Sequence, residues 1–129
     1  MIYLDTSVAL AQLLAEDRIP PVDLWHAPLV SSRLLQYEVW TRIHARGLGR
    51  SHGELARQLI NRLALIEVAA PILGRALEPF PTPVRTLDAL HLASIDFLRQ
   101  HGQDVRLASY DARLLTAAKA LDISIFDLH

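Results

Sequence analysis

The side chains of this sequence best suited to chemistry are carboxylates at the ends of apolar runs. Asp5 comes directly after the run Ile2–Leu4, and Asp111 follows a similar run at 105–109. A carboxylate at the end of a strand lies where the crevice of a parallel sheet opens. It also faces the positive end of the helix that follows. Asp5 and Asp111 are therefore candidates for one site at the carboxyl edge of a sheet.

Two further acidic residues, Glu38 and Asp88, lie in segments with helical patterning. Large apolar residues surround Glu38 in the segment 34–40, and Asp88 stands near the start of a helix with His91 one turn later. For His91, we expect a hydrogen bond to a carboxylate rather than metal ligation, because the other candidate ligands are all oxygen donors. His91 is therefore assigned a supporting role.

Each acidic residue also has an ordinary structural explanation when taken alone. Asp5 and Asp111 can cap helices, Asp88 can be a favourable charge in a first turn, and Glu38 can face solvent. If the four lie together, however, their charges repel one another unless a cation lies between them. Hard oxygen ligands favour magnesium or manganese.

Composition restricts the alternatives. The chain has 129 residues, 51% of them hydrophobic, which is enough for one core. Its net charge of -1 gives no overall positive field, so any RNA contact must be local. The absence of cysteine excludes disulfides, thiolate zinc sites and a cysteine nucleophile. The N-terminus does not resemble a secretory signal and no apolar run suits a membrane span, so we expect a cytoplasmic protein.

Short apolar runs alternate with helical patterns along the chain. The predicted strands are 2–4, 29–31, 65–68, 105–109 and 123–126, and the predicted helices are about 8–14, 34–45, 51–64, 72–77, 86–98 and 111–121. Thr6 or Ser7 is expected to cap the first helix. Prolines between Glu78 and Val84 predict an exposed irregular loop. This alternation predicts an α/β fold with a mostly parallel sheet and helices on both faces.

These segments resemble, in order and approximate spacing, the PilT N-terminus (PIN) domains, and within them the VapC toxins of bacterial toxin-antitoxin pairs. The resemblance rests on Tyr3-Leu4-Asp5-Thr6-Ser7, the mid-helix Glu38, the run Asp88–Ala93 and the run Ser109–Ala118. Each motif is weak alone, but the ordered set is specific and spans nearly the whole chain. It implies a single PIN domain over residues 1–129, built as a three-layer α/β/α sandwich with a short, mostly parallel central sheet.

The resemblance also implies a site and a reaction. The implied catalytic and metal-binding residues are Asp5, Glu38, Asp88 and Asp111, supported by Thr6, Ser7, His91 and Ser109. The implied cofactor is Mg²⁺, for which Mn²⁺ can substitute, and it would activate a water for endonucleolytic hydrolysis of RNA. The products would carry 3′-hydroxyl and 5′-phosphate ends. A cognate VapB-like antitoxin would hold the enzyme inactive, and a homodimer is expected.

Two features depart from the family pattern. Asp122 stands where a turn glycine is common, and the proline-rich loop after Glu78 is unusually stiff. Neither feature belongs to the acidic set, so the expected chemistry is unchanged.

Candidate RNA contacts come from arginine, which supplies all but one of the 13 basic residues. Arg42, Arg46 and Arg50 follow Glu38, and their guanidinium groups suit phosphate. A solvated helix face or a protein contact explains these arginines equally well. The aromatic residues Trp25, Tyr37 and Trp40 could stack on bases, but we assign them to core packing, because aromatic residues on helices more often belong to a core.

Two other functions are compatible with parts of the pattern. A phosphatase could use Asp5 as a covalent nucleophile after the first strand. That chemistry usually requires a second aspartate two residues on, where this chain has Ser7, and Lys119 is the only lysine. A non-catalytic binding module on the same fold is the other alternative. The complete acidic set argues against that module.

Overall fold

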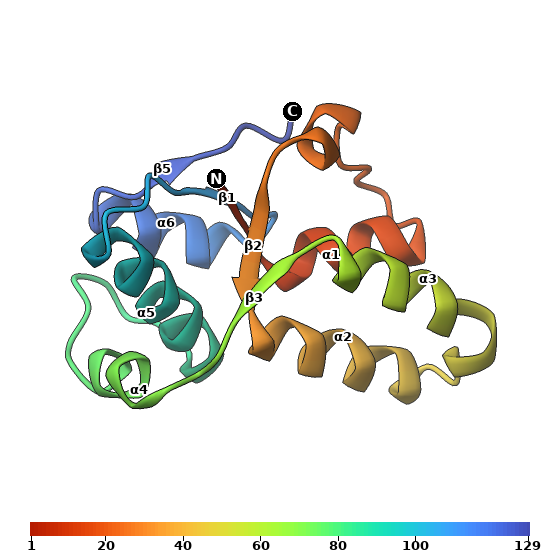
Figure 1. Ribbon diagram of the computed structural model, residues 1–129, viewed down its shortest axis with the longest axis horizontal. Coiled ribbons are helices and arrows are strands. Elements are labelled where there is room, and N and C mark those ends of the chain that lie inside the picture. The colour runs from red at the N-terminus through yellow and green to blue at the C-terminus, as the bar shows by residue number, and fades with distance from the viewer.

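Five short strands form a central sheet in which every neighbouring pair is parallel (Figure 1). The computed structural model describes residues 1–129. The strands are β1 (Ile2–Leu4), β2 (Leu29–Ser32), β3 (Ala64–Ile66), β4 (Arg106–Ala108) and β5 (Ser124–Ile125). The helices are α1 (Thr6–Leu14), the 3₁₀ helix η1 (Val22–His26), α2 (Arg33–Ala45), α3 (Gly49–Asn61), α4 (Ala70–Ala76), α5 (Thr86–Gln100) and α6 (Ala112–Ala120). None of the helices has both the length and the hydropathy needed to cross a membrane.

The strand order is β3-β2-β1-β4-β5, which places β1 at the centre. Tyr3 of β1 pairs with Val30 of β2 on one side and with Leu107 of β4 on the other. The chain adds β2 and β3 outward in one direction and then crosses over to add β4 and β5 in the other. In an open parallel sheet, this reversal opens a crevice at the carboxyl ends of the strands beside it.

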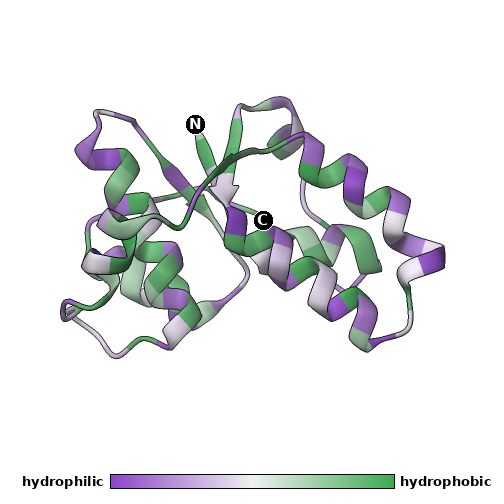
Figure 2. Ribbon diagram, turned by 60° about the horizontal axis from the view of Figure 1, so that its bottom comes forward, coloured by the Kyte–Doolittle hydropathy of each residue, from purple (hydrophilic) through white to green (hydrophobic).

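Helices cover both faces of the sheet and form two hydrophobic cores. Ile2 and Leu4 of β1 pack into the core formed with α1, α2 and α3, whereas Tyr3 packs into the core formed with α5 and α6. This division follows from the alternation of side chains along a strand. Figure 1 shows α1, α2 and α3 on one side of the strands and α4, α5 and α6 on the other. Figure 2 shows hydrophobic and hydrophilic residues alternating along these helices, as expected for helices with one buried face.

Local differences from the predicted elements occur mainly at chain breaks. The helix η1 follows Pro21 directly and was not predicted, because a short 3₁₀ turn has no helical periodicity to reveal it. The helix α3 begins at Gly49, two residues before the predicted start. Gly47, at φ 68, makes the left-handed turn that separates α2 from α3.

The two sequence departures are accommodated locally. Asp122 adopts φ 58, so aspartate takes the left-handed conformation that glycine usually supplies. Aspartate is among the few residues that tolerate this conformation. The proline-rich segment between α4 and α5 has no regular structure and most of its residues are exposed or half-buried, as predicted.

Candidate active site

The predicted acidic residues meet at one cavity of about 740 Å³ at the carboxyl edge of the sheet. Asp5 follows β1, and Asp111 is the N-cap residue of α6, just after β4. Glu38 projects from α2 and Asp88 from the first turn of α5. All four side chains line this cavity. The structure therefore brings together carboxylates from both sides of the sheet.

Asp5 is held by two serine hydroxyls and is only 6% exposed. Its Oδ2 accepts a hydrogen bond from Ser7 Oγ at 2.6 Å and another from Ser109 Oγ at 2.8 Å. Asp5 occupies the N-cap position of α1, but its side chain makes no capping hydrogen bond. The prediction that Thr6 or Ser7 caps this helix is therefore wrong, and capping does not explain the Asp5 carboxylate either.

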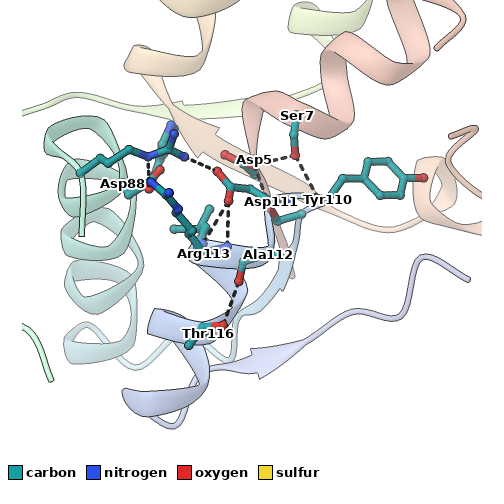
Figure 3. A network of polar contacts seen from close by, with 12 residues as sticks. Asp5, Ser7, Asp88, Tyr110, Asp111, Ala112, Arg113 and Thr116 are labelled. Atoms are coloured by element: carbon teal, nitrogen blue, oxygen red, sulfur yellow. Dashed lines mark hydrogen bonds and ion pairs between the residues drawn. The ribbon is translucent and has the colours of Figure 1, made fainter. Parts of the chain in front are cut away.

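Asp111 divides its two oxygens between two tasks (Figure 3). Oδ1 caps α6 by accepting hydrogen bonds from the backbone N–H groups of Arg113 at 2.9 Å and Leu114 at 3.3 Å. Oδ2 accepts a hydrogen bond from Arg85 Nη2 at 2.7 Å. Helix capping therefore accounts for only one oxygen of Asp111. The other oxygen lies on the side of the cavity.

Glu38 is oriented by a hydrogen-bonded chain that begins in the core. Its Oε1 accepts hydrogen bonds from Thr6 Oγ1 at 3.0 Å and from His91 Nε2 at 2.8 Å. The other ring nitrogen, Nδ1 of His91, lies 2.7 Å from the buried hydroxyl of Tyr3. Since a carboxylate only accepts, Nε2 carries a proton. Nδ1 accepts from the Tyr3 hydroxyl when the ring is neutral and donates to it when the ring is charged. The hydrogen bond expected between His91 and a carboxylate is present.

The surroundings of His91 favour its charged form. Burial lowers the pKa of His91, but the hydrogen bond to Glu38 and the charges of nearby carboxylates outweigh it, so the pKa is raised above its ordinary value of 6.5. For Tyr3, burial raises the pKa, which keeps its hydroxyl neutral. The chain from Tyr3 to Glu38 thus places a proton donor behind the Glu38 carboxylate.

Asp88 is 8% exposed and lies beside a residue that the sequence analysis missed. Burial raises the pKa of Asp88, and the hydrogen bond from Arg85 offsets part of this rise. Arg85 Nε lies 3.2 Å from Asp88 Oδ2, and both Asp88 and Asp111 raise the pKa of Arg85. The opposite charges of Arg85 and Asp88 at positions three apart in a helical segment were a signal for this contact.

The donor set fits a hard divalent cation, although the geometry is not that of a closed metal site. Asp5, Glu38 and Asp88 each have one oxygen held by protein donors and a second oxygen that accepts no hydrogen bond from the protein. No three acidic or histidine side chains are close enough together in this conformation to bind one ion. Anchored carboxylates with open oxygens suit Mg²⁺ or Mn²⁺ after modest side-chain rotation.

The candidate RNA-binding arginines are only partly associated with this cavity. Arg42 lines it, one helical turn beyond Glu38. Arg46 and Arg50 are exposed and do not line it, because they lie further along α2 and α3. Arg18, which the sequence analysis did not single out, lines the cavity and donates a hydrogen bond to the backbone oxygen of Tyr110 at 2.8 Å.

The assignment of Tyr37 to core packing is wrong. Its side chain on α2 is exposed, at 67%. The neighbouring Glu38 turns towards the cavity, so Tyr37 turns outward from the helix. Aromatic residues on helices more often belong to a core, which was the reason for the assignment, but only the helical face that carries Leu35, Val39 and Ile43 is buried.

Removing the Ser109 hydroxyl tests how strongly the structure depends on the support beneath Asp5. Ser109 Oγ donates to Asp5 Oδ2 and accepts from the backbone N–H of Asp111 at 2.9 Å. We expect Ser109→Ala to lower the free energy of unfolding by about 2 kcal/mol in urea titrations without metal, because buried partners lose their hydrogen bonds. The exposed Ser124→Ala is the control, with a change below about 0.5 kcal/mol. Equal effects of the two substitutions would contradict the supporting role.

Comparison with known proteins identifies relatives over the whole fold. The family model of the PIN domain matches residues 2–120. Ribonuclease VapC46 from Mycobacterium tuberculosis is 33% identical over 128 residues, covering 96% of this chain and 95% of the relative. Ribonuclease VapC47 from the same species is 29% identical over 126 residues, covering 92% of this chain and 90% of the relative.

Solved structures have the same architecture. The crystal structure of Mycobacterium tuberculosis VapC20, described as a toxin that cleaves the sarcin-ricin loop, matches with a TM-score of 0.69 and 21% identity over 91% of this chain and 95% of that chain. A toxin-antitoxin complex from Klebsiella pneumoniae includes a chain that matches with a TM-score of 0.68 and 12% identity, covering 100% of this chain and 98% of that chain. These likenesses show the three-layer α/β/α fold. Together with the family model and the relative at 33% identity, they confirm the predicted resemblance: this chain belongs to the PIN domain family.

Proposed function

We propose that this chain is a VapC-like endoribonuclease toxin that hydrolyses RNA phosphodiester bonds with Mg²⁺, or with Mn²⁺ in its place. The metal ligands and catalytic residues are Asp5, Glu38, Asp88 and Asp111. The observation that carries the proposal is that three of these carboxylates present an open oxygen to one cavity while the protein holds the other oxygen. The two relatives named as ribonucleases support RNA as the substrate, and the family implies a divalent metal ion.

The residues of the chain position the acidic groups for this chemistry. Ser7 and Ser109 fix Asp5, and His91 with Thr6 fixes Glu38, so the open oxygens are oriented before the substrate arrives. When bound, the metal ion supplies the polarisation of a water molecule and neutralises charge on the phosphate. Water as nucleophile leaves the ribose 2′-hydroxyl without a role in the reaction.

RNA would enter past two arginines of the cavity lining, which also contains the exposed acidic residues Glu16 and Asp17. Arg18 and Arg42 line the cavity around its acidic centre. Their guanidinium groups can bind the phosphates that flank the scissile bond, while the acidic centre receives that bond together with the metal ion. These two arginines supply cationic groups at the cavity of a chain whose net charge is -1.

Protein partners complete the proposal. We propose that the chain acts as one domain, forms a homodimer and is neutralised by a cognate VapB-like antitoxin. The structural neighbour from a toxin-antitoxin complex supports the antitoxin. Leu73 of α4 and Leu77, the C-cap residue of that helix, are exposed, and their apolar surface is suited to a protein contact.

The chemistry of the product ends tests the proposal. The purified chain, freed of any antitoxin, should cut RNA in the presence of Mg²⁺. Cleavage should stop when EDTA removes the metal ion. Sequencing of the 5′ ends after brief expression, with Asp88→Asn as the inactive comparison, would locate the cleavage site. We expect 5′-phosphate and 3′-hydroxyl ends, because an external water attacks the phosphorus.

A modified substrate provides a stricter version of the same test. An oligonucleotide with 2′-deoxyribose at the mapped cleavage site should be cut at a rate within about threefold of the all-ribose substrate, since the 2′-hydroxyl is not the nucleophile. A ribonuclease that attacks with the ribose hydroxyl cannot cut this substrate. Cyclic 2′,3′-phosphate ends, or loss of cleavage on deoxy substitution, would overturn the proposed reaction.

A further inference from the structure

Arg85 lines the acidic cavity but has no role in the proposed reaction. It is the N-cap residue of α5, and its guanidinium bridges Asp88 and Asp111. Nε lies 3.2 Å from Asp88 Oδ2 and Nη2 lies 2.7 Å from Asp111 Oδ2. The Arg85 side chain is 58% exposed, so packing does not hold it in place. Its position depends on the two ion pairs.

The bridge affects Asp111 more than the other acidic residues. Asp111 Oδ1 is used to cap α6, and Oδ2 is bound by Arg85, so neither oxygen is open. Asp88 has Oδ1 without a protein donor, and only its Oδ2 faces Arg85. A cation that binds Asp111 through Oδ2 must therefore weaken the contact between Arg85 and Asp111. Both cations compete for the same negative charge.

A second cavity lies beside the acidic one and shares Arg85 and Asp88 with it. It has a volume of about 510 Å³, and its other lining residues include Thr82, Arg113 and Thr116. Arg85, Arg113 and the Thr82 hydroxyl along this cavity are donors suited to a phosphodiester, whereas the Thr116 hydroxyl already donates to the backbone oxygen of Ala112. Arg85 therefore stands between the acidic centre and a neighbouring space that favours phosphate.

We propose that Arg85 competes with the divalent cation for Asp88 and Asp111, and that cation binding releases its guanidinium to hold an RNA phosphate in the second cavity. The inference rests on the proposed ribonuclease function and adds a phosphate-binding residue to it. Before metal binding, Arg85 neutralises carboxylates that would otherwise repel one another. After the exchange, its charge serves the RNA strand next to the scissile bond. Metal loading and RNA binding are thereby coupled through one side chain.

Titration of the metal-free chain with Mn²⁺, in the absence of RNA, tests the competition. Removing the competing charge in Arg85→Gln should tighten Mn²⁺ binding about tenfold in isothermal titration calorimetry. Arg85→Lys keeps the charge but cannot bridge both carboxylates, so its Mn²⁺ affinity should lie between those of Arg85→Gln and the wild type. Unchanged or weaker Mn²⁺ binding by Arg85→Gln would overturn the competition.

Arg99→Gln is the matched control. Arg99 lies on the same helix and forms an ion pair with Asp96, three residues away, as Arg85 does with Asp88. The control removes the same charge far from the cavity, and its Mn²⁺ affinity should stay within about twofold of the wild type. If both variants gained Mn²⁺ affinity equally, the effect would come from the change in net charge, and the proposal would be overturned.

Cleavage kinetics test the second part of the proposal, in which Arg85 binds an RNA phosphate. Here Arg85→Gln should weaken binding of RNA, although it strengthens binding of the metal ion. At saturating Mg²⁺, Arg85→Gln should raise the KM for RNA about tenfold despite its tighter metal binding. An unchanged KM would overturn the phosphate contact. If the proposed ribonuclease function is wrong, the wild type will not cleave RNA. The competition between Arg85 and Mn²⁺ is tested separately, because the Mn²⁺ titration contains no RNA.

Discussion

Replacing Asp5 by asparagine is expected to lower the rate of RNA cleavage by about a thousandfold while the protein stays folded. Asp5 lies at the end of the central strand β1, and its Oδ2 is fixed by two serine hydroxyls. Asparagine retains a carbonyl oxygen that can accept these hydrogen bonds, but it removes the negative charge. The substitution therefore changes the affinity of the site for a divalent cation more than it changes the fold.

The measurement is single-turnover cleavage of the mapped RNA at several Mg²⁺ concentrations, together with urea unfolding. Asp104→Asn is the control, since Asp104 is exposed outside the cavity and loses the same charge. The control should cleave at the wild-type rate. Equal rates for Asp5→Asn and the wild type would show that Asp5 is not part of the catalytic centre.

The second large effect is expected from His91→Ala, which should lower the free energy of unfolding by about 3 kcal/mol. His91 is 1% exposed and connects Tyr3 to Glu38. Its removal leaves the Tyr3 hydroxyl buried without this partner, opens a cavity and takes one donor from Glu38. Cleavage should also fall, by about tenfold or more, because Glu38 loses its orientation.

The loss of stability in His91→Ala should depend on pH. Because the pKa of His91 in the folded chain is raised above 6.5, the folded state binds its proton more tightly than the unfolded state. This contribution is fully present below pH 6.5 and is lost as the pH rises through the raised value. The difference between wild type and variant, measured by urea unfolding, should therefore shrink with increasing pH. His26→Ala, at an exposed histidine, is the control, and an equally large loss there would contradict the proposed role.

The sequence allowed much of the fold to be predicted, because the strands are short apolar runs that alternate with amphipathic helices. The placement of Asp5 and Asp111 at strand ends followed from the same pattern. The start of α3 was less well predicted, since no side chain caps it. The helix η1 was missed because its few residues carry no periodic signal.

The residues of the site that lie inside helices were harder to predict from the sequence than those at strand ends. Glu38 and Asp88 lie inside helices, where sequence neighbours do not reveal which side chains meet across the sheet, so they entered the site mainly through family resemblance. The expected hydrogen bond of His91 is present, but its link to Tyr3 joins residues distant in the sequence. The contact between Arg85 and Asp111 is likewise tertiary. Such contacts depend on the packing of β1, β4 and α5.

The most direct test of the acidic centre is a crystal structure of the chain grown with Mn²⁺ and measured near the manganese absorption edge. We expect an anomalous peak in the cavity, with carboxylate oxygens of Asp5 and Asp88 about 2.1 Å from the ion. Oxygens of Glu38 or Asp111 would bind directly or through water. A fully occupied Mn²⁺ site elsewhere, with no peak among these carboxylates, would contradict the proposed metal centre.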